Sequence, residues 1–280
     1  MFFLTVAILF LSSSCARKIP LSNTTKPVAN TVIIVTDTVP TYNQQELKVM
    51  SYNIHHANPP SKAVGITDID AVVSVIKKEN PDIVTLQEVD MLVPRSNKQD
   101  QTQLIANQLN MEYHFYKTIN LGGGEYGVAI LSKYKLSNIR QLTLPKIEGK
   151  AETRTLGYAD INFSGQKITV ACTHLDARDE PTRVLQTEAI VKELQSVVNP
   201  IILCGDWNSS VGSKSIKFLQ QYFENSCTDH CGLTVPAVNP KNTIDYVLTR
   251  NSNWLVKRHS VTAETYASDH RPVVVTFKLD

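Results

Sequence analysis

From Leu47 to the end of the chain, short apolar runs with the period of β-strands alternate with segments that have the period of α-helices. Neither a change in composition nor a detectable repeat interrupts this alternation, so we predict one domain over the whole region. Each sheet must bury an apolar face, and the helices between the strands can cover one. The pattern therefore predicts layered α/β or α+β packing, with two sheets face to face and helices outside them.

Four helices are expected. Apolar residues recur at helical spacing between Ile66 and Ile76, where Thr67 and Asp70 resemble a capping pair. Further helices are predicted over 101–110 and 214–221 and on the apolar stripe formed by Val184, Val191, Leu194 and Val198. Strands are predicted over 47–55, 82–89, 113–118, 127–131, 156–163, 167–175, 200–204, 244–248, 254–261 and 272–277.

The amino terminus carries the most apolar run, Phe2 to Leu11, about half the length that a membrane-spanning helix needs, roughly 20 residues. Three serines and Cys15 follow it, a pattern that resembles a bacterial lipoprotein export signal. The run lacks a basic start, and Ser12 stands where such signals carry an aliphatic residue. The alternative is an N-terminal strand with an incidental cysteine.

We therefore predict an export signal over residues 1–14 and a tether over residues 15–45, anchored to lipid at Cys15. The domain over residues 46–280 would be held at the bacterial cell envelope, or released to the periplasm or the exterior.

The other cysteines are too sparse for a disulfide scaffold. Cys172 and Cys204 lie within strand-like runs and are expected to be small buried hydrophobic residues. Cys227 and Cys231 bracket a tripeptide that ends in His230. No second Cys-x-x-Cys or His-x-x-x-His supports zinc, so a local disulfide or two free thiols is favoured.

Several predicted strands end in polar clusters, where open sheets commonly place active sites. The clusters are 51–56, 86–90, 173–176, 204–208, 243–246 and 268–272. Each alone could be an ordinary turn. Together they supply four carboxylates, two amides and two histidines, namely Glu88, Asp206, Asp245, Asp269, Asn53, Asn208, His174 and His270. Oxygen donors of this kind suit Mg²⁺ or Mn²⁺, and histidines can transfer protons, so the set predicts metal-dependent phosphoester hydrolysis.

The ordered series SYNIH, LQEVD, YGVAILSKY, THLD, GDWN, IDYVL and SDHRPV, between Leu47 and Phe277, resembles the endonuclease/exonuclease/phosphatase family. The resemblance implies a four-layered α/β sandwich, with two central mixed β-sheets flanked by helices and the site at one edge of the sheets. It also implies a phosphoester hydrolase that uses Mg²⁺ or Mn²⁺.

The same resemblance assigns roles to individual residues. Glu88 would be the principal metal ligand, and Asn53 and Asp269 would help to build the metal shell. Asp206 would position or deprotonate the attacking water, and Asn208 would hold that water or a phosphate oxygen.

The remaining roles concern proton transfer and the substrate. Asp245 would pair with His270, and His174 would contact the phosphate or protonate the leaving oxygen. Glu125 stands where some members place an acidic partner for that second histidine, and Arg154 matches a position that can meet substrate phosphate.

Substrate class is less constrained. Abasic-site endonucleases carry Asp where this chain has His55, which argues against DNA repair. The net charge, 28 − 26 = +2, supplies no strong positive field for nucleic acid. We expect a monomer acting on a small or lipid-derived phosphoester. The alternatives are a secreted nuclease for DNA or RNA, and a non-catalytic binding lipoprotein that would not need this set of acids and histidines. Substrate choice is expected to depend on 209–242 and the Gly-rich 121–125.

Overall fold

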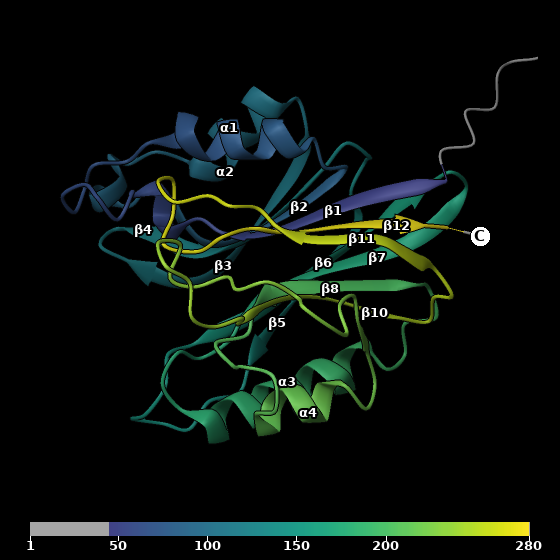
Figure 1. Ribbon diagram of the computed structural model, residues 1–280. Coiled ribbons are helices and arrows are strands. Elements are labelled where there is room, and N and C mark those ends of the chain that lie inside the picture. Colours follow the sequence, from purple (N-terminus) through teal and green to yellow (C-terminus); the bar gives the residue numbers. More distant parts are fainter. Residues whose placement is uncertain (1–44, 280) are drawn as a thin grey trace, which may run out of the picture. The chain divides into compact units, whose positions relative to one another are not determined.

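The computed structural model describes residues 45–279, and within them the strands form two six-stranded sheets (Figure 1). The first sheet has the order β11-β12-β1-β2-β4-β3. Its strands, in that order, are Leu255–Val261, Val273–Lys278, Glu46–Asn53, Ile83–Met91, Gly124–Ser132 and Glu112–Leu121. The second sheet has the order β5-β6-β7-β8-β10-β9. Its strands are Ser137–Leu144, Arg154–Phe163, Gln166–His174, Ile201–Asp206, Asp245–Arg250 and Glu224–Asn225.

Helices cover the outer face of each sheet. The helices α1 (Ile69–Glu79) and α2 (Gln101–Leu109) share a buried cluster with the first sheet. On the other side, α3 (Glu180–Leu194) and α4 (Lys214–Leu219) pack on the second sheet. Two short 3₁₀ turns, His55–Ala57 and Pro94–Ser96, complete the helical elements of the described region. Figure 1 shows the resulting order of layers, helix, sheet, sheet, helix, which confirms the predicted four-layered α/β sandwich with mixed sheets.

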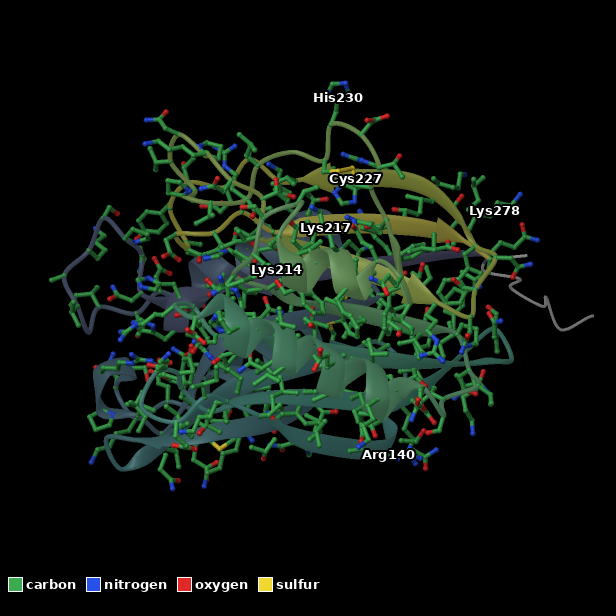
Figure 2. The ribbon with its side chains drawn as sticks, turned by 90° about the horizontal axis from the view of Figure 1, so that it is seen from below. Arg140, Lys214, Lys217, Cys227, His230 and Lys278 are labelled. Atoms are coloured by element: carbon green, nitrogen blue, oxygen red, sulfur yellow. A yellow bond between two sulfur atoms is a disulfide. The ribbon has the colours of Figure 1, made fainter. Side chains whose placement is uncertain are left out.

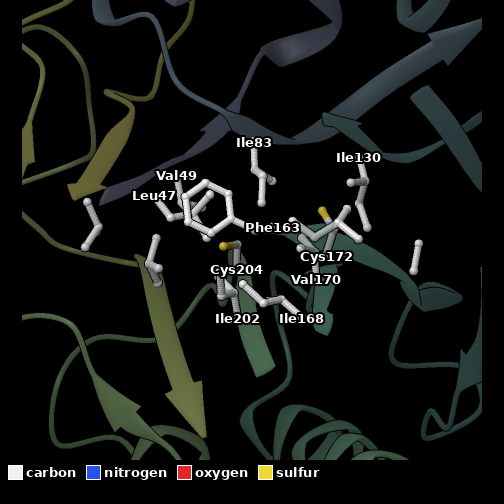
Figure 3. Close-up of a cluster of buried hydrophobic side chains, with 14 of the residues drawn as sticks. Leu47, Val49, Ile83, Ile130, Phe163, Ile168, Val170, Cys172, Ile202 and Cys204 are labelled. Atoms are coloured by element: carbon white, nitrogen blue, oxygen red, sulfur yellow. The ribbon is translucent and has the colours of Figure 1, made fainter. Parts of the chain in front are cut away.

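The two sheets meet through their inner faces. In β1, Leu47 and Val49 point into the cluster between the sheets, whereas Met50 and Tyr52 belong to the cluster under α1. This alternation follows from the two-residue period of a strand. From the second sheet Val170, Cys172 and Cys204 join the inner cluster, as Figure 3 shows. Both cysteines are free and fully buried, as predicted.

Each sheet has one parallel pair of neighbouring strands. In the first sheet β1 pairs with β2, and in the second β7 pairs with β8, while the other pairings are antiparallel. A parallel pair needs a crossover, which α1 and α3 provide. The carboxyl ends of the paired strands therefore lie at one edge of each sheet.

Local details correct some of the predicted elements. The cap of α1 is Asp68, whose carboxylate accepts a hydrogen bond from Ala71 N at 2.9 Å, rather than the predicted pair of Thr67 and Asp70. A carboxylate at the position before the first helical residue satisfies an amide that the helix leaves unpaired. Helix α3 ends at Leu194, so Val198, which is 87% exposed, does not belong to its buried stripe. Strands β5 and β9 were not predicted.

The sulfur atoms of Cys227 and Cys231 form a disulfide, one of the two states expected for them. His230 is exposed and projects from that loop in Figure 2. No helix among residues 45–279 combines the length and the apolarity that crossing a membrane requires. The predicted export signal, Cys15 and nearly all of the predicted tether lie outside the described residues.

Candidate active site

The polar strand ends converge where the two sheets face each other. In the second sheet, His174 at the end of β7 pairs in register with Asp206 at the end of β8. Asp206 in turn pairs with Asp245, the first residue of the antiparallel β10. The three residues thus form a row across neighbouring strands. Inner-face Cys172 and Cys204 precede His174 and Asp206 by two residues, so the strand period directs both side chains into the space between the sheets.

Asn53, at the end of β1, joins the two sheets. It is fully buried, and its Nδ2 donates to Glu88 Oε1 and to Asp206 Oδ2, each at 3.0 Å. Its Oδ1 accepts a hydrogen bond from His55 N at 3.0 Å. The amide nitrogen therefore faces the two carboxylates. In this geometry Asn53 positions the carboxylates of Glu88 and Asp206 relative to each other.

Glu88 does not mark the end of its strand, because β2 continues to Met91. It has a φ of 58°, and the pairing of β2 with β4 shifts register between Leu86 and Val89. A β-bulge of this kind re-aims a side chain without ending the strand. Burial alone would raise the pKa of Glu88, but His56 and Asn53 favour the charged carboxylate and hold the pKa well below its usual range.

Asp206 lies at the centre of the site and is 1% exposed. Its Oδ2 is 3.4 Å from His174 Nε2 and 3.7 Å from His270 Nε2. Burial, followed by repulsion from Asp245, raises its pKa to about 7, against the opposing charge of His270. A carboxyl group with this pKa can take up and release a proton near neutral pH.

Asp245 and His270 form a buried pair. His270 Nδ1 is 2.9 Å from Asp245 Oδ2, as predicted from the sequence. Burial alone would lower the pKa of His270, but the Asp245 carboxylate outweighs it, with help from Asp206 and Asp269, and raises the pKa to about 10. His270 is therefore a cation at neutral pH, and its Nε2 faces Asp206.

His174 differs from His270 although both rings approach the same carboxylate. Its Nε2 is 3.0 Å from Asn208 Nδ2, and the same Nδ2 donates to the backbone oxygen of Leu175 at 3.1 Å. A carbonyl oxygen can only accept, so the Asn208 atom bonded to it is the NH₂ group of the side-chain amide. The same NH₂ group donates to His174, and Nε2 of His174 therefore accepts. Burial, and then the nearby Arg154, hold the pKa of His174 well below its usual range, so the ring is neutral.

The predicted partnership of Glu125 with His174 is wrong. Glu125 forms an ion pair with Lys117 Nζ at 2.9 Å, and the two residues lie on the neighbouring strands β4 and β3. His174 Nδ1 is buried and has no hydrogen-bond partner among the described residues. Glu125 is thus paired within the β3–β4 hairpin and does not reach His174 in the second sheet.

Two other predicted residues lie at the margin. Asp269 is half-buried between β11 and β12, and it reaches the site through its charge, which raises the pKa of His270. It belongs to none of the ligand groups that the described residues offer a metal ion. Arg154, at the start of β6, is 4% exposed and lies close enough to His174 to lower the pKa of that ring.

The site also contains His55 and His56, to which the sequence assigned no role. Both have positive φ in the 3₁₀ turn after β1, and His56 Nδ1 lies 3.9 Å from Glu88 Oε2. His55, His56 and Glu88 form one group whose ligand atoms lie within 4.8 Å of one another. The available signal in the sequence was two consecutive histidines at the end of the predicted strand 47–55.

The donor set fits a divalent cation. Glu88, His174 and Asp206 form a second group with ligand atoms within 4.8 Å, and Asp206, Asp245 and His270 form a third. His56 Nδ1 is buried and lacks a hydrogen-bond partner in the described structure. Burial, and then repulsion from Asp245, disfavour the charged form of Asp206, and a bound cation would offset both effects.

The segments expected to select the substrate border the site only in part. Ser209, Ser210 and Ser213 line a pocket of about 1000 Å³ together with Asn208. Gly122 and Gly123, both at positive φ, form the turn between β3 and β4, so this glycine-rich segment is a hairpin connection.

A known protein family and several solved structures are similar to this chain. The model of the endonuclease/exonuclease/phosphatase family matches residues 50–270. A protein of that family from Beutenbergia cavernae superimposes with a TM-score of 0.70 at 21% identity, over 84% of this chain and 72% of the other.

Two further solved structures are similar. A mannosyl-6-phosphatase from Bacteroides thetaiotaomicron has a TM-score of 0.66 at 19% identity, over 82% of this chain and 98% of its own. The catalytic domain of human Nocturnin, solved with a bound sulfate anion, has a TM-score of 0.65 at 20% identity, over 84% and 95%. At these identities the likeness shows a shared fold.

Proposed function

Since the chain belongs to the endonuclease/exonuclease/phosphatase family, whose members hydrolyse phosphoesters, we propose that it is a divalent-metal-dependent hydrolase of small or lipid-derived phosphoesters. The observation that supports this best is the buried row of His174, Asp206 and Asp245, with Asn53 joining Asp206 to Glu88. A binding protein would have no need to bury three ionisable groups side by side.

A phosphoester resists attack by water because it is an anion. Glu88, held by Asn53 Nδ2, would be the principal ligand of Mg²⁺ or Mn²⁺, and the bound ion would neutralise charge on the phosphoryl oxygens. The proposal includes either of these two ions as the natural cofactor.

The chain's own groups would do the rest. Asp206, with a pKa of about 7, would accept the proton of the attacking water, and Asn208 would hold that water in line. His270, charged by its bond to Asp245, would stabilise the negative charge that develops beside Asp206. Neutral His174 would contact the phosphate, and Arg154 would meet it from β6.

Small substrates are favoured because the chain has a net charge of only +2, whereas a groove that follows a nucleic-acid backbone needs several unpaired cations. One protein of the same fold is a mannosyl-6-phosphatase, which acts on a small phosphoester. A secreted nuclease remains the second candidate.

The deciding experiment is a substrate panel assayed with and without added metal. It would compare plasmid DNA, sphingomyelin, inositol phosphates, mannose 6-phosphate and an aryl phosphodiester. Hydrolysis of small phosphoesters or sphingomyelin is the expected result. Cleavage of DNA alone would favour the nuclease, and no turnover on any member would favour the binding protein.

We also propose that the protein is exported and lipid-anchored at Cys15. The apolar run before Cys15 and the Cys227–Cys231 disulfide support export, since disulfides persist in oxidising compartments. Expression of the full chain and of Cys15→Ser in a bacterium, followed by membrane fractionation, tests this. A membrane-bound wild type and a released variant are expected, and equal distribution of both would contradict the anchor.

A further inference from the structure

A second, basic pocket lies beside the catalytic residues. It has a volume of about 430 Å³ and is lined by four cationic side chains and two acidic ones, Lys146, Lys150, Arg154, Arg178, Glu152 and Asp176. We call it the basic pocket. The lining residues carry formal charges of +4 and −2, and Glu148 outside the lining pairs with Lys146 at 3.8 Å, which leaves an excess of one positive charge.

One of the two acids is already satisfied by the backbone. Asp176 is 1% exposed, and its carboxylate accepts hydrogen bonds from Glu152 N at 3.1 Å, Arg178 N at 2.9 Å and Asp179 N at 2.7 Å. These bonds tie the loop before β6 to the loop after β7. Asp176 therefore acts as a positioning residue that holds the two walls of the basic pocket together, and its charge is spread over three amides.

The cations are less well satisfied. Arg154 is 4% exposed, and its Nε is buried without a hydrogen-bond partner in the described structure, while Nη2 contacts the exposed Glu152 at 3.2 Å. Lys150 and Arg178 are exposed, and neither forms a side-chain ion pair with any residue of the range 45–279. A buried guanidinium whose side-chain ion pair is with an exposed carboxylate carries charge that a bound anion would offset.

The basic pocket adjoins the reaction centre through two strands. Leu156 of β6 pairs with Thr173 of β7, so Arg154 and His174 lie at neighbouring strand ends, and the Arg154 charge lowers the pKa of His174. Asp176 follows His174 by two residues. A substrate whose reacting phosphoester lies at His174 and Asp206 can thus place another group in the basic pocket.

We propose that the basic pocket binds a second, non-reacting phosphate group of the substrate, so that the preferred substrates carry two phosphates. This inference rests on the proposed function and names its substrate class. Lys150 and Arg178 would contact the second phosphate, with Arg154 between it and the reacting one. A phosphate group suits this site because Lys150 and Arg178 come from the two loops that Asp176 joins and line the same pocket.

The first test counts phosphate sites by calorimetry, with full-length protein, Mg²⁺ and inorganic phosphate as the probe. We expect the Lys150→Gln/Arg178→Gln double variant to bind one phosphate fewer than the wild type, or to bind it at least tenfold more weakly. The matched control is Lys217→Gln/Lys278→Gln, which removes the same charge from two side chains that line none of the described pockets and lie apart on the surface in Figure 2. Equal binding by the wild type and the pocket variant would overturn the proposal.

The second test separates a substrate phosphate from a free one. The wild type should show a KM for inositol 1,4-bisphosphate at least tenfold below that for inositol 1-phosphate, and the pocket variant should lose at least fivefold of this ratio. The control variant should keep it. A wild-type ratio near one would show that the site takes free phosphate and not the substrate, and would overturn the substrate assignment. Failure of the proposed function would appear differently, as no turnover of either ester with the calorimetric difference intact.

Discussion

His270 and Asp245 are joined by a 2.9 Å contact between Nδ1 and Oδ2, and the opposite ring nitrogen of His270 faces Asp206 at 3.7 Å. Both residues are almost completely buried. The pair comes from β10 and the loop before β12, which belong to different sheets. It therefore sets a positive charge beside the central carboxylate of the site.

Replacing this partner tests the role of the charge. In Asp245→Asn the amide oxygen can still accept from Nδ1, but the negative charge that keeps His270 protonated is lost. We expect turnover to fall by about 10²-fold or more, with the fold intact. Steady-state kcat, with circular dichroism as the control for folding, measures this. Wild-type kcat in the folded variant would remove His270 from the mechanism.

Asp206 and His174 are expected to contribute more directly. Asp206→Asn removes the proton acceptor, and His174→Ala removes the ring that contacts the phosphate. Each change should lower turnover by roughly 10²- to 10⁴-fold. Near-unchanged hydrolysis by either purified variant would contradict its assignment.

Glu125 should behave differently from those residues. Because its carboxylate is bound by Lys117 at 2.9 Å, Glu125→Gln removes an exposed ion pair worth about 0–1 kcal/mol. Turnover should stay within about twofold of wild type, since the residue does not touch His174. A loss comparable to that of His174→Ala would restore the partnership that the structure contradicts.

Metal removal should affect both activity and stability. A chelator should abolish hydrolysis, and Mg²⁺ or Mn²⁺ should restore it. Since the ion binds only the assembled site, the metal at one hundred times its Kd should stabilise the fold by about 2.7 kcal/mol. Thermal melting with and without metal detects this shift independently of turnover. Chelator-resistant hydrolysis would exclude the metal mechanism.

The packing between the sheets depends on Gly157 of β6. A Cβ at this position would lie 2.2 Å from Cγ of Tyr116, which reaches across from β3. Gly157→Ala should therefore destabilise the fold by about 1–3 kcal/mol. Adding Tyr116→Leu should recover part of this loss, because the two sites are in contact. The free energy of unfolding of each variant is measured by chemical denaturation. If the effects of the two substitutions simply add, the Tyr116 ring is not the reason that Gly157→Ala is destabilising.

Much of the architecture followed from the sequence because strand and helix periods report which side chains share a face. The alternation in 167–175 placed Cys172 and His174 on one face, and the structure has both between the sheets. Edge strands gave weaker signals. β5 was missed because most of its residues are exposed and lack an apolar face.

The candidate active site shows which features local sequence patterns cannot predict. The sequence by itself determined which ionisable residues lie in or close to strands, their order along the chain and the chemistry that such donors suit. Only the tertiary structure decided which of them touch, because the contact between Asn53 and Asp206 spans 153 residues and two sheets. The bulge that turns Glu88 inward, the pairing of Glu125 with Lys117 and the basic pocket likewise depend on neighbours distant in sequence, which no local period encodes.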